Sequence, residues 1–145
     1  MSAIKAKELV LLLVFIALLS AKATGSAKLH NSFTGLTYST VSMRSSQTIT
    51  ILDGIYRRYS NGEKVVGHRL AKSELSMLYQ LVGRIDLSKI NDLEVPSRRH
   101  RFDGAMLAVI EVQIGQKVYV SVPFDHDNPP SQLKPLADQL SSMHL

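Results

Sequence analysis

The chain has 145 residues, of which 45% are hydrophobic and 20% charged, and its formal net charge is +5. It contains no cysteine, which excludes a disulfide framework, a thiolate metal site, a cysteine nucleophile and the lipid-modified cysteine of a bacterial lipoprotein. A chain of this length has room for one domain of ordinary size and not for two.

The first 23 residues have the pattern of a secretory signal peptide. Lys5 and Lys7 precede an unbroken apolar run from Leu9 to Leu19, and Ala21-Lys22-Ala23 supplies the small-x-small cleavage pattern. The run is shorter than the roughly 20 apolar residues that a membrane-spanning helix needs. We therefore expect cleavage after Ala23 and an exported protein, periplasmic or secreted. The lack of cysteine favours a bacterial compartment, because small domains of the eukaryotic secretory route are often rich in disulfides.

Removal of this leader leaves 122 residues with 14 basic and 11 acidic side chains, a net charge of +3. Residues 24–32 are small and polar and predict a flexible N-terminal segment. Residues 33–145 predict a single α+β domain.

From Phe33 to Leu70 the pattern is that of β-strands, because β-branched and aromatic residues alternate with polar ones. Asp53-Gly54 and Asn61-Gly62 are turn dipeptides. Asn61-Gly62 lies between two strand-like runs and predicts a hairpin with a type I′ turn, which needs positive φ at both central residues.

The next segment predicts a helix. Ser73 is placed as its N-cap, and a stripe of apolar residues follows at helical spacing. The stripe comprises Leu75, Leu78, Val82 and Ile85. A short helical turn is expected around Leu87–Leu93, and Glu94–Gly104 predicts an exposed loop with three arginines.

Residues Ala105–Ile114 and Lys117–Phe124 predict a second hairpin around Gly115-Gln116, with a type II′ turn and a central place in the sheet. Pro129-Pro130 ends the strand, and a last helix follows with Leu133, Leu136, Ala137 and Leu140 on one face. Pro135 is compatible with its first turn only. The fold class is therefore α+β, an antiparallel sheet with one or two helices on one face.

No nucleophile, base and orienting group occur in a recognisable catalytic pattern, so neither an enzyme nor a cofactor is expected. The triplet Asp125-His126-Asp127 offers metal-ligating groups, but adjacent side chains of an extended segment point to opposite sides. We interpret the triplet as a solvated turn in which Asp127 or Asn128 caps the last helix, and expect no metal.

The candidate partner-binding residues lie in two basic clusters and at two turns. They are Arg57, Arg58, Arg98, Arg99 and Arg101, together with Asn61, Gly62 and Asp103. Nucleic acid is not expected as a partner of an exported chain of this modest charge. The competing interpretation is that the arginines are ordinary solvated surface charges.

The order of elements resembles emfourin-like proteins, small α+β inhibitors of thermolysin-like metallopeptidases. The resemblance covers residues 46–142. It rests on the glycine-punctuated hairpin around Asn61-Gly62, the leucine-spaced helix, the loop ending in Phe102-Asp103-Gly104, the Val/Ile hairpin and the helix that follows Pro130. The resemblance implies a class of function and assigns no individual inhibitory residue.

Two functions stay open from the sequence. The first is an exported module that binds another protein, with inhibition of a secreted peptidase as the form that the resemblance implies. The second is an envelope-associated domain that binds an anionic polymer through its arginine clusters. After cleavage of the leader, no stable membrane span is expected.

Overall fold

The computed structural model describes residues 33–143. The predicted signal peptide, residues 1–23, and the predicted flexible segment, residues 24–32, lie outside the described residues.

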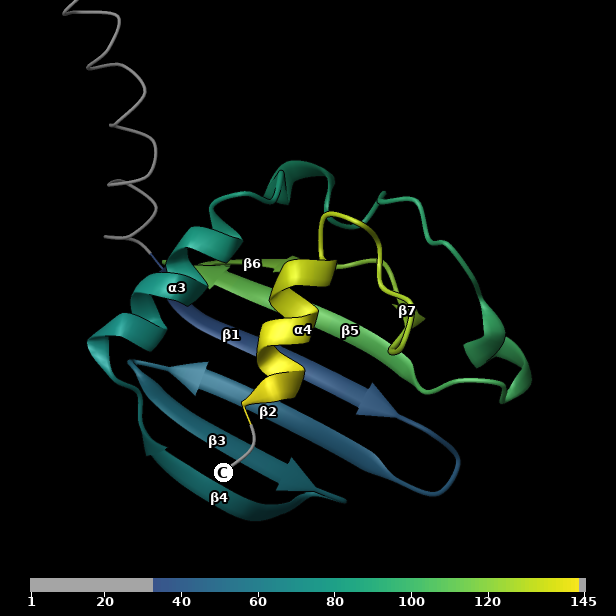
Figure 1. Ribbon diagram of the computed structural model, residues 1–145, viewed down its shortest axis with the longest axis horizontal. Helices are drawn as coiled ribbons and strands as arrows, with labels where there is room; N and C mark the ends of the chain where they lie inside the picture. The colour runs from purple at the N-terminus through teal and green to yellow at the C-terminus, as the bar shows by residue number, and fades with distance from the viewer. Residues whose placement is uncertain (1–32, 144–145) are drawn as a thin grey trace, which may run out of the picture. The chain divides into compact units, whose positions relative to one another are not determined.

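The first four strands form an antiparallel meander (Figure 1). They are β1 (Phe33–Val41), β2 (Ser46–Leu52), β3 (Ile55–Ser60) and β4 (Glu63–Arg69). The β3–β4 turn has φ of 51° at Asn61 and 84° at Gly62, and the β2–β3 turn has 51° at Asp53 and 73° at Gly54. Positive φ at both central residues is the type I′ geometry, so the Asn61-Gly62 hairpin is confirmed.

The second hairpin joins the meander through β1. Strand β5 (Leu107–Ile114) pairs with β1, and β6 (Lys117–Val120) and β7 (Phe124–Asp125) pair with the other side of β5. The sheet order is β4-β3-β2-β1-β5-β6. Gly115 has φ of 60°, as the predicted type II′ turn requires. The predicted central place is right for β5 and wrong for β6, which forms an edge. Pro123, which has no N–H to donate, lies in the break between β6 and β7.

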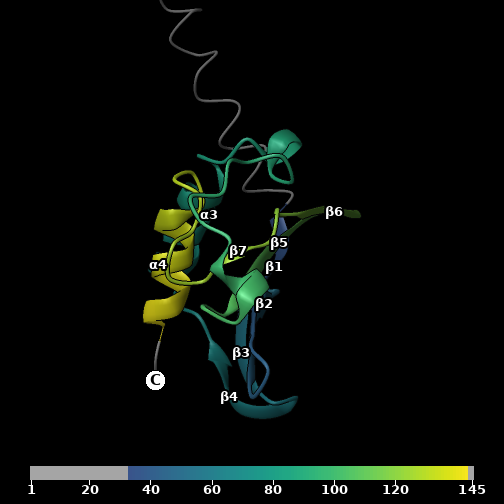
Figure 2. The same ribbon diagram turned by 90° about the vertical axis from the view of Figure 1, so that its right-hand side faces the viewer.

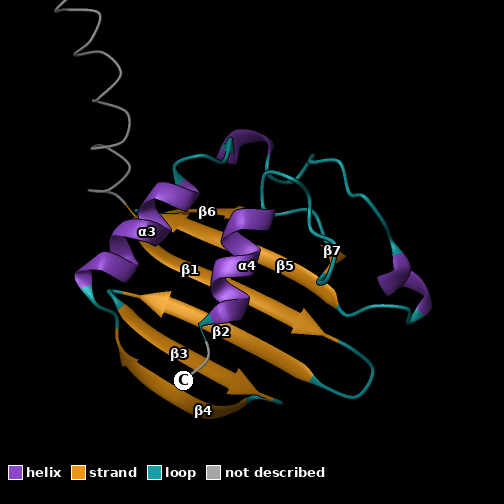
Figure 3. Ribbon diagram, viewed as in Figure 1, coloured by secondary structure: helices purple, strands orange, loops and turns teal. Residues whose placement is uncertain are grey.

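Both helices, α3 (Lys72–Val82) and α4 (Lys134–Ser142), lie on the same face of the sheet (Figures 2 and 3). The main core side chains come from this face and from the helices: Leu36, Tyr38, Ile51, Tyr56, Leu78, Val82, Ile110, Val112, Leu136 and Leu140. The α+β architecture is confirmed. Neither described helix has the length and apolar character that crossing a membrane requires.

The start of α3 differs from the prediction. The N-cap is Ala71, not Ser73, and the Ala71 amide donates to the Glu74 carboxylate at 2.7 Å. Alanine has no side-chain acceptor, so only this half of a capping box exists. Leu70, directly after β4, is buried, and its amide donates to the Gly54 carbonyl at 2.9 Å, so the chain leaves the sheet one residue before the N-cap. In α4, Pro135 lies in the first turn as predicted.

Three connections lie at one end of the sheet. The β1–β2 turn, the β3–β4 turn and the segment that leads into β5 all follow from antiparallel pairing, because β1 and β3 end where β2, β4 and β5 begin. In Figure 1 this is the right-hand end of the molecule. The predicted exposed loop, with its arginines, therefore lies beside a turn for which the sequence predicted no role.

Candidate functional site

A buried aspartate holds the basic loop in place. The carboxylate of Asp125, at the end of β7, is 0% exposed. Its Oδ1 accepts hydrogen bonds from the His100 amide at 2.8 Å and from His100 Nδ1 at 2.5 Å. Its Oδ2 accepts from the Ser97 hydroxyl at 2.5 Å and the Arg99 amide at 2.9 Å. Both oxygens thus bind the loop, and each accepts one backbone amide.

A second set of contacts surrounds this anchor. Asn128 Nδ2 donates to the Ser97 hydroxyl at 2.9 Å, and the Arg99 guanidinium binds Asp127 at 2.6 Å. The loop itself forms a 3-10 turn, η2 (Arg99–Phe102), that ends at Asp103 with φ of 57°. The loop is therefore tied to the β7 segment both by its backbone and by its side chains.

The electrostatics follow from these contacts. Burial by itself would raise the pKa of Asp125, but the hydrogen bonds from Ser97 and from the His100 and Arg99 amides outweigh it and hold the pKa well below its usual range. The hydrogen bond from Arg99 likewise lowers the pKa of Asp127. Asp125 is therefore ionised, and because a carboxylate only accepts, Nδ1 of His100 must carry a proton.

The Asp125–His100 pair supports the loop. The imidazole is only 6% exposed. The Ser97 hydroxyl binds the same carboxylate on its other oxygen, so it is not placed as a nucleophile beside the imidazole. Within residues 33–143, no three His, Asp or Glu side chains lie close enough together to hold a metal ion.

The interpretation of residues 125–127 as a solvated turn is wrong for Asp125. His126 and Asp127 lie in a turn and are exposed, but Asp125 is buried, and Asp127 pairs with Arg99. Neither Asp127 nor Asn128 caps the last helix, whose N-cap is Leu133. The intervening Pro129 and Pro130 are buried, and they separate the turn from the helix.

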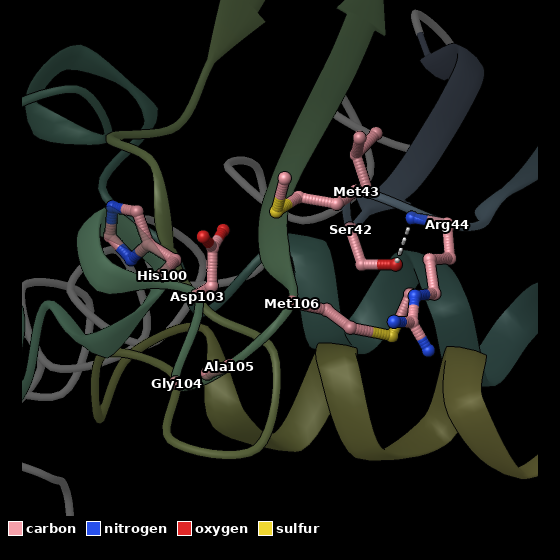
Figure 4. A pocket seen from close by; sticks show the side chains of 9 residues that line it. Ser42, Met43, Arg44, His100, Asp103, Gly104, Ala105 and Met106 are labelled. Carbon is pink, nitrogen blue, oxygen red and sulfur yellow. Dashed lines mark hydrogen bonds between the residues drawn. The ribbon is translucent and has the colours of Figure 1, made fainter.

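A groove lies between the anchored loop and the β1–β2 turn (Figure 4). Its volume is about 570 Å³. Val41, Ser42, Met43 and Arg44 line one side, and His100 with Asp103–Met106 line the other. The turn is held by the Ser42 hydroxyl, which accepts from the amides of Arg44 at 3.3 Å and Ser45 at 3.1 Å.

Two apolar side chains at this end of the molecule are conspicuously exposed. Met43 is 83% exposed and Phe102 is 85% exposed, more than any other large hydrophobic side chain described. Solvent exposure of single apolar residues is ordinary, but here Met43 lines the groove beside Arg44, and Phe102 lies on the loop that carries Arg98 and Arg101. No hydrogen bond or ion pair within residues 33–143 involves the Arg98 or Arg101 guanidinium, whereas that of Arg99 is held by Asp127.

The predicted arginine clusters do not form one surface. Arg57 and Arg58 are neighbours in β3 and point to opposite faces: Arg57 lines a depression on the bare face with Glu111, and Arg58 lines a cavity under α4 with Tyr38. Of the residues predicted for partner binding, only Arg98, Arg99, Arg101 and Asp103 share the loop.

The predicted Asn61-Gly62 turn lies at the same end of the sheet, but the contacts of Asn61 give it a structural role. The Asn61 side-chain oxygen accepts from the Ser46 amide at 2.9 Å, which ties the β3–β4 turn to the start of β2. Sequence reasoning missed Met43, Arg44 and Met106. The exposed Met-Arg pair within a polar turn was the one available signal, and it is weak by itself.

Comparisons with protein-family models, curated proteins and solved structures give no match. The resemblance to emfourin-like proteins therefore stays a prediction.

Proposed function

We propose that this protein is a binding module that recognises an acidic segment of another protein through the anchored loop Arg98–Asp103 and the surface beside it. The observation that carries the proposal is the buried Asp125 carboxylate, which fixes the loop backbone through the Arg99 and His100 amides. A preformed loop loses little conformational entropy when a partner binds, so more of the contact energy contributes to affinity.

Charge and apolar exposure support an acidic partner. Arg98 and Arg101, whose guanidinium groups have no hydrogen-bond or ion-pair partner within residues 33–143, lie on the same loop as Phe102, and Arg44 lines the groove beside that loop. Arginine and aromatic side chains are the types that most often dominate the binding energy of protein interfaces. We also propose that the mature chain acts outside the cytoplasm, on the basis of the predicted leader.

Binding to an anionic polymer is the less well supported alternative. A polymer needs a continuous basic face, and Arg57 and Arg58 lie on opposite faces of the sheet. At most one of the two can therefore share a surface with the loop arginines.

The test compares three forms of the protein as affinity baits in extracts of its own cells and medium. The full coding sequence is expressed so that the host processes the leader. The double substitution Arg98→Ala and Arg101→Ala removes the free charges, and Arg84→Ala, an exposed arginine beyond α3, is the matched control. We expect a protein that the wild type and the control retain and the double variant loses. Equal retention by all three forms, or no specific partner, refutes the proposal.

The inhibitor form of the proposal has its own test. The wild type is titrated against a thermolysin-type metallopeptidase that cleaves a fluorogenic peptide. Inhibition at micromolar protein that the double variant lacks supports it; full activity at micromolar excess limits the proposal to binding without inhibition of that class.

A further inference from the structure

A second groove lies on the other side of the anchored loop. It has a volume of about 360 Å³. Its lining is Val95, Arg98, His100, Arg101, Leu107, Val122 and Pro123. Four of these are apolar and two are the arginines without a described partner, so the groove combines an apolar floor with two positive charges.

The walls of this second groove are fixed before any ligand arrives. Leu107 pairs with Asp125 in the β5–β7 ladder, and the Val122 amide donates to the Ile90 carbonyl at 3.1 Å. The His100 ring is held by Asp125 through Nδ1. One wall is therefore sheet edge and the other is the anchored loop.

Size and charge restrict the ligand. The volume is at the lower end of the roughly 300–1,000 Å³ typical of ligand pockets, which suits one or two apolar side chains better than a large cofactor. A guanidinium prefers a carboxylate, to which it can donate two parallel hydrogen bonds. The fitting ligand therefore carries an apolar group close to a negative charge.

Resting on the proposed function, we infer that the second groove gives the module its specificity: it takes an apolar side chain that neighbours an acidic residue in an extended segment of the partner. Arg98 and Arg101 bind the carboxylates, and Val95, Leu107 and Val122 contact the apolar side chain. A segment that has acidic but no apolar side chains leaves the apolar floor of the second groove exposed to water, and it therefore binds more weakly.

The test uses three labelled ten-residue peptides and fluorescence anisotropy. The first alternates glutamate with leucine, the second has serine for every leucine, and the third has lysine for every glutamate. We expect the first peptide to bind the wild-type protein at least about tenfold more tightly than either of the others, because burial of one leucine side chain is worth about that factor or more. Decanoate, which has a carboxylate and an apolar chain but no peptide backbone, is the competitor.

Two variants and one mapping experiment locate the binding. Val95→Glu places a negative charge on the floor and should weaken the first peptide at least about tenfold, while Val95→Ile should leave it within about twofold. Circular dichroism and thermal melts check that both variants are folded. Amide shifts of the wild type on titration should move at Leu107 and Val122, which gives a readout independent of any variant.

The outcomes separate this inference from the proposed function. Equal binding of the serine and leucine peptides overturns the inference. The inference also fails if no peptide binds. In both cases the proposed function stands as long as the bait experiment yields a partner that depends on Arg98 and Arg101. Decanoate binding as tight as the first peptide overturns the assignment to a peptide. Amide shifts confined to Ser42–Arg44 place the binding in the first groove and also overturn the inference.

Discussion

Replacement of Asp125 by asparagine removes the negative charge from the anchor and keeps its shape. The amide group of asparagine has one accepting oxygen and one donating nitrogen. Since each carboxylate oxygen accepts one backbone amide, from His100 on Oδ1 and from Arg99 on Oδ2, either orientation of the new side chain turns a donor toward one of these N–H groups. One partly buried backbone amide therefore loses its acceptor whichever way the side chain rotates.

The size of the effect follows from burial. An amide left without a partner in the interior costs about 1–3 kcal/mol, and the remaining hydrogen bonds lose the strengthening that the charge provides. We therefore expect Asp125→Asn to lower the free energy of unfolding by about 2–5 kcal/mol, a large share of the about 5–15 kcal/mol typical of a small domain.

Urea unfolding followed by far-ultraviolet circular dichroism measures this loss, and hydrogen exchange reports the Arg99 and His100 amides directly. The matched control is Asp127→Asn, because the Asp127–Arg99 ion pair is half exposed and its removal should change stability little. A loss below about 0.5 kcal/mol for Asp125→Asn, with unchanged exchange at the two amides, refutes the assignment of Asp125 as the anchor.

Four further results are expected. Because the folded-state pKa of Asp125 is lowered, the stabilisation that its carboxylate provides is complete above the ordinary carboxyl pKa of 3.8 and is lost as the pH falls below that value. Below that pH the unfolding free energy of Asp125→Asn should therefore depend less on pH than that of the wild type. Parallel curves of unfolding free energy against pH for the two proteins contradict this. Leu140→Ala, at a side chain that is 0% exposed between α4 and the sheet, should cost about 2–5 kcal/mol in urea unfolding, and a cost below about 1 kcal/mol argues against that packing. Gly62→Ala should cost about 1–2 kcal/mol through its φ of 84° alone, since a Cβ there meets no atom within 4 Å; no change in the urea midpoint contradicts the type I′ turn. Phe102→Ser should leave the melting temperature nearly unchanged and abolish partner retention in the bait experiment; retained binding excludes Phe102 from the interface.

Local patterns predicted the elements of this fold well. The turn dipeptide Asn61-Gly62 specifies its hairpin by backbone sterics, and the apolar spacing of α4 specifies its buried face, so both are encoded within a few residues. Sheet order is not local. Nothing near Lys117 indicates that β6 lies at an edge, because that depends on whether β1 pairs with β5 or with β6.

The anchored loop shows the same limit at the site. Asp125 and its donors at Ser97, Arg99 and His100 are separated by 25 to 28 positions in the chain. Alternation along residues 125–127 would place Asp125 and Asp127 on one side, and it predicts neither that Asp125 alone is buried nor that it meets a loop. The arginines were predicted from charge alone. Only tertiary structure separates Arg98 and Arg101, whose guanidinium groups have no partner within residues 33–143, from Arg99, which is bound to Asp127.

The place of β1 between β2 and β5 has a consequence for synthesis on the ribosome. In the β1–β5 pair Leu36 lies opposite Val112, which is translated much later. One edge of β1 therefore stays unpaired while α3 and the arginine loop are translated. Contacts so distant along the chain form slowly. Premature termination anywhere before Leu107 would therefore leave β1, the strand farthest from the stop codon, unpaired on one side, so that it becomes an exposed edge of the unfinished sheet.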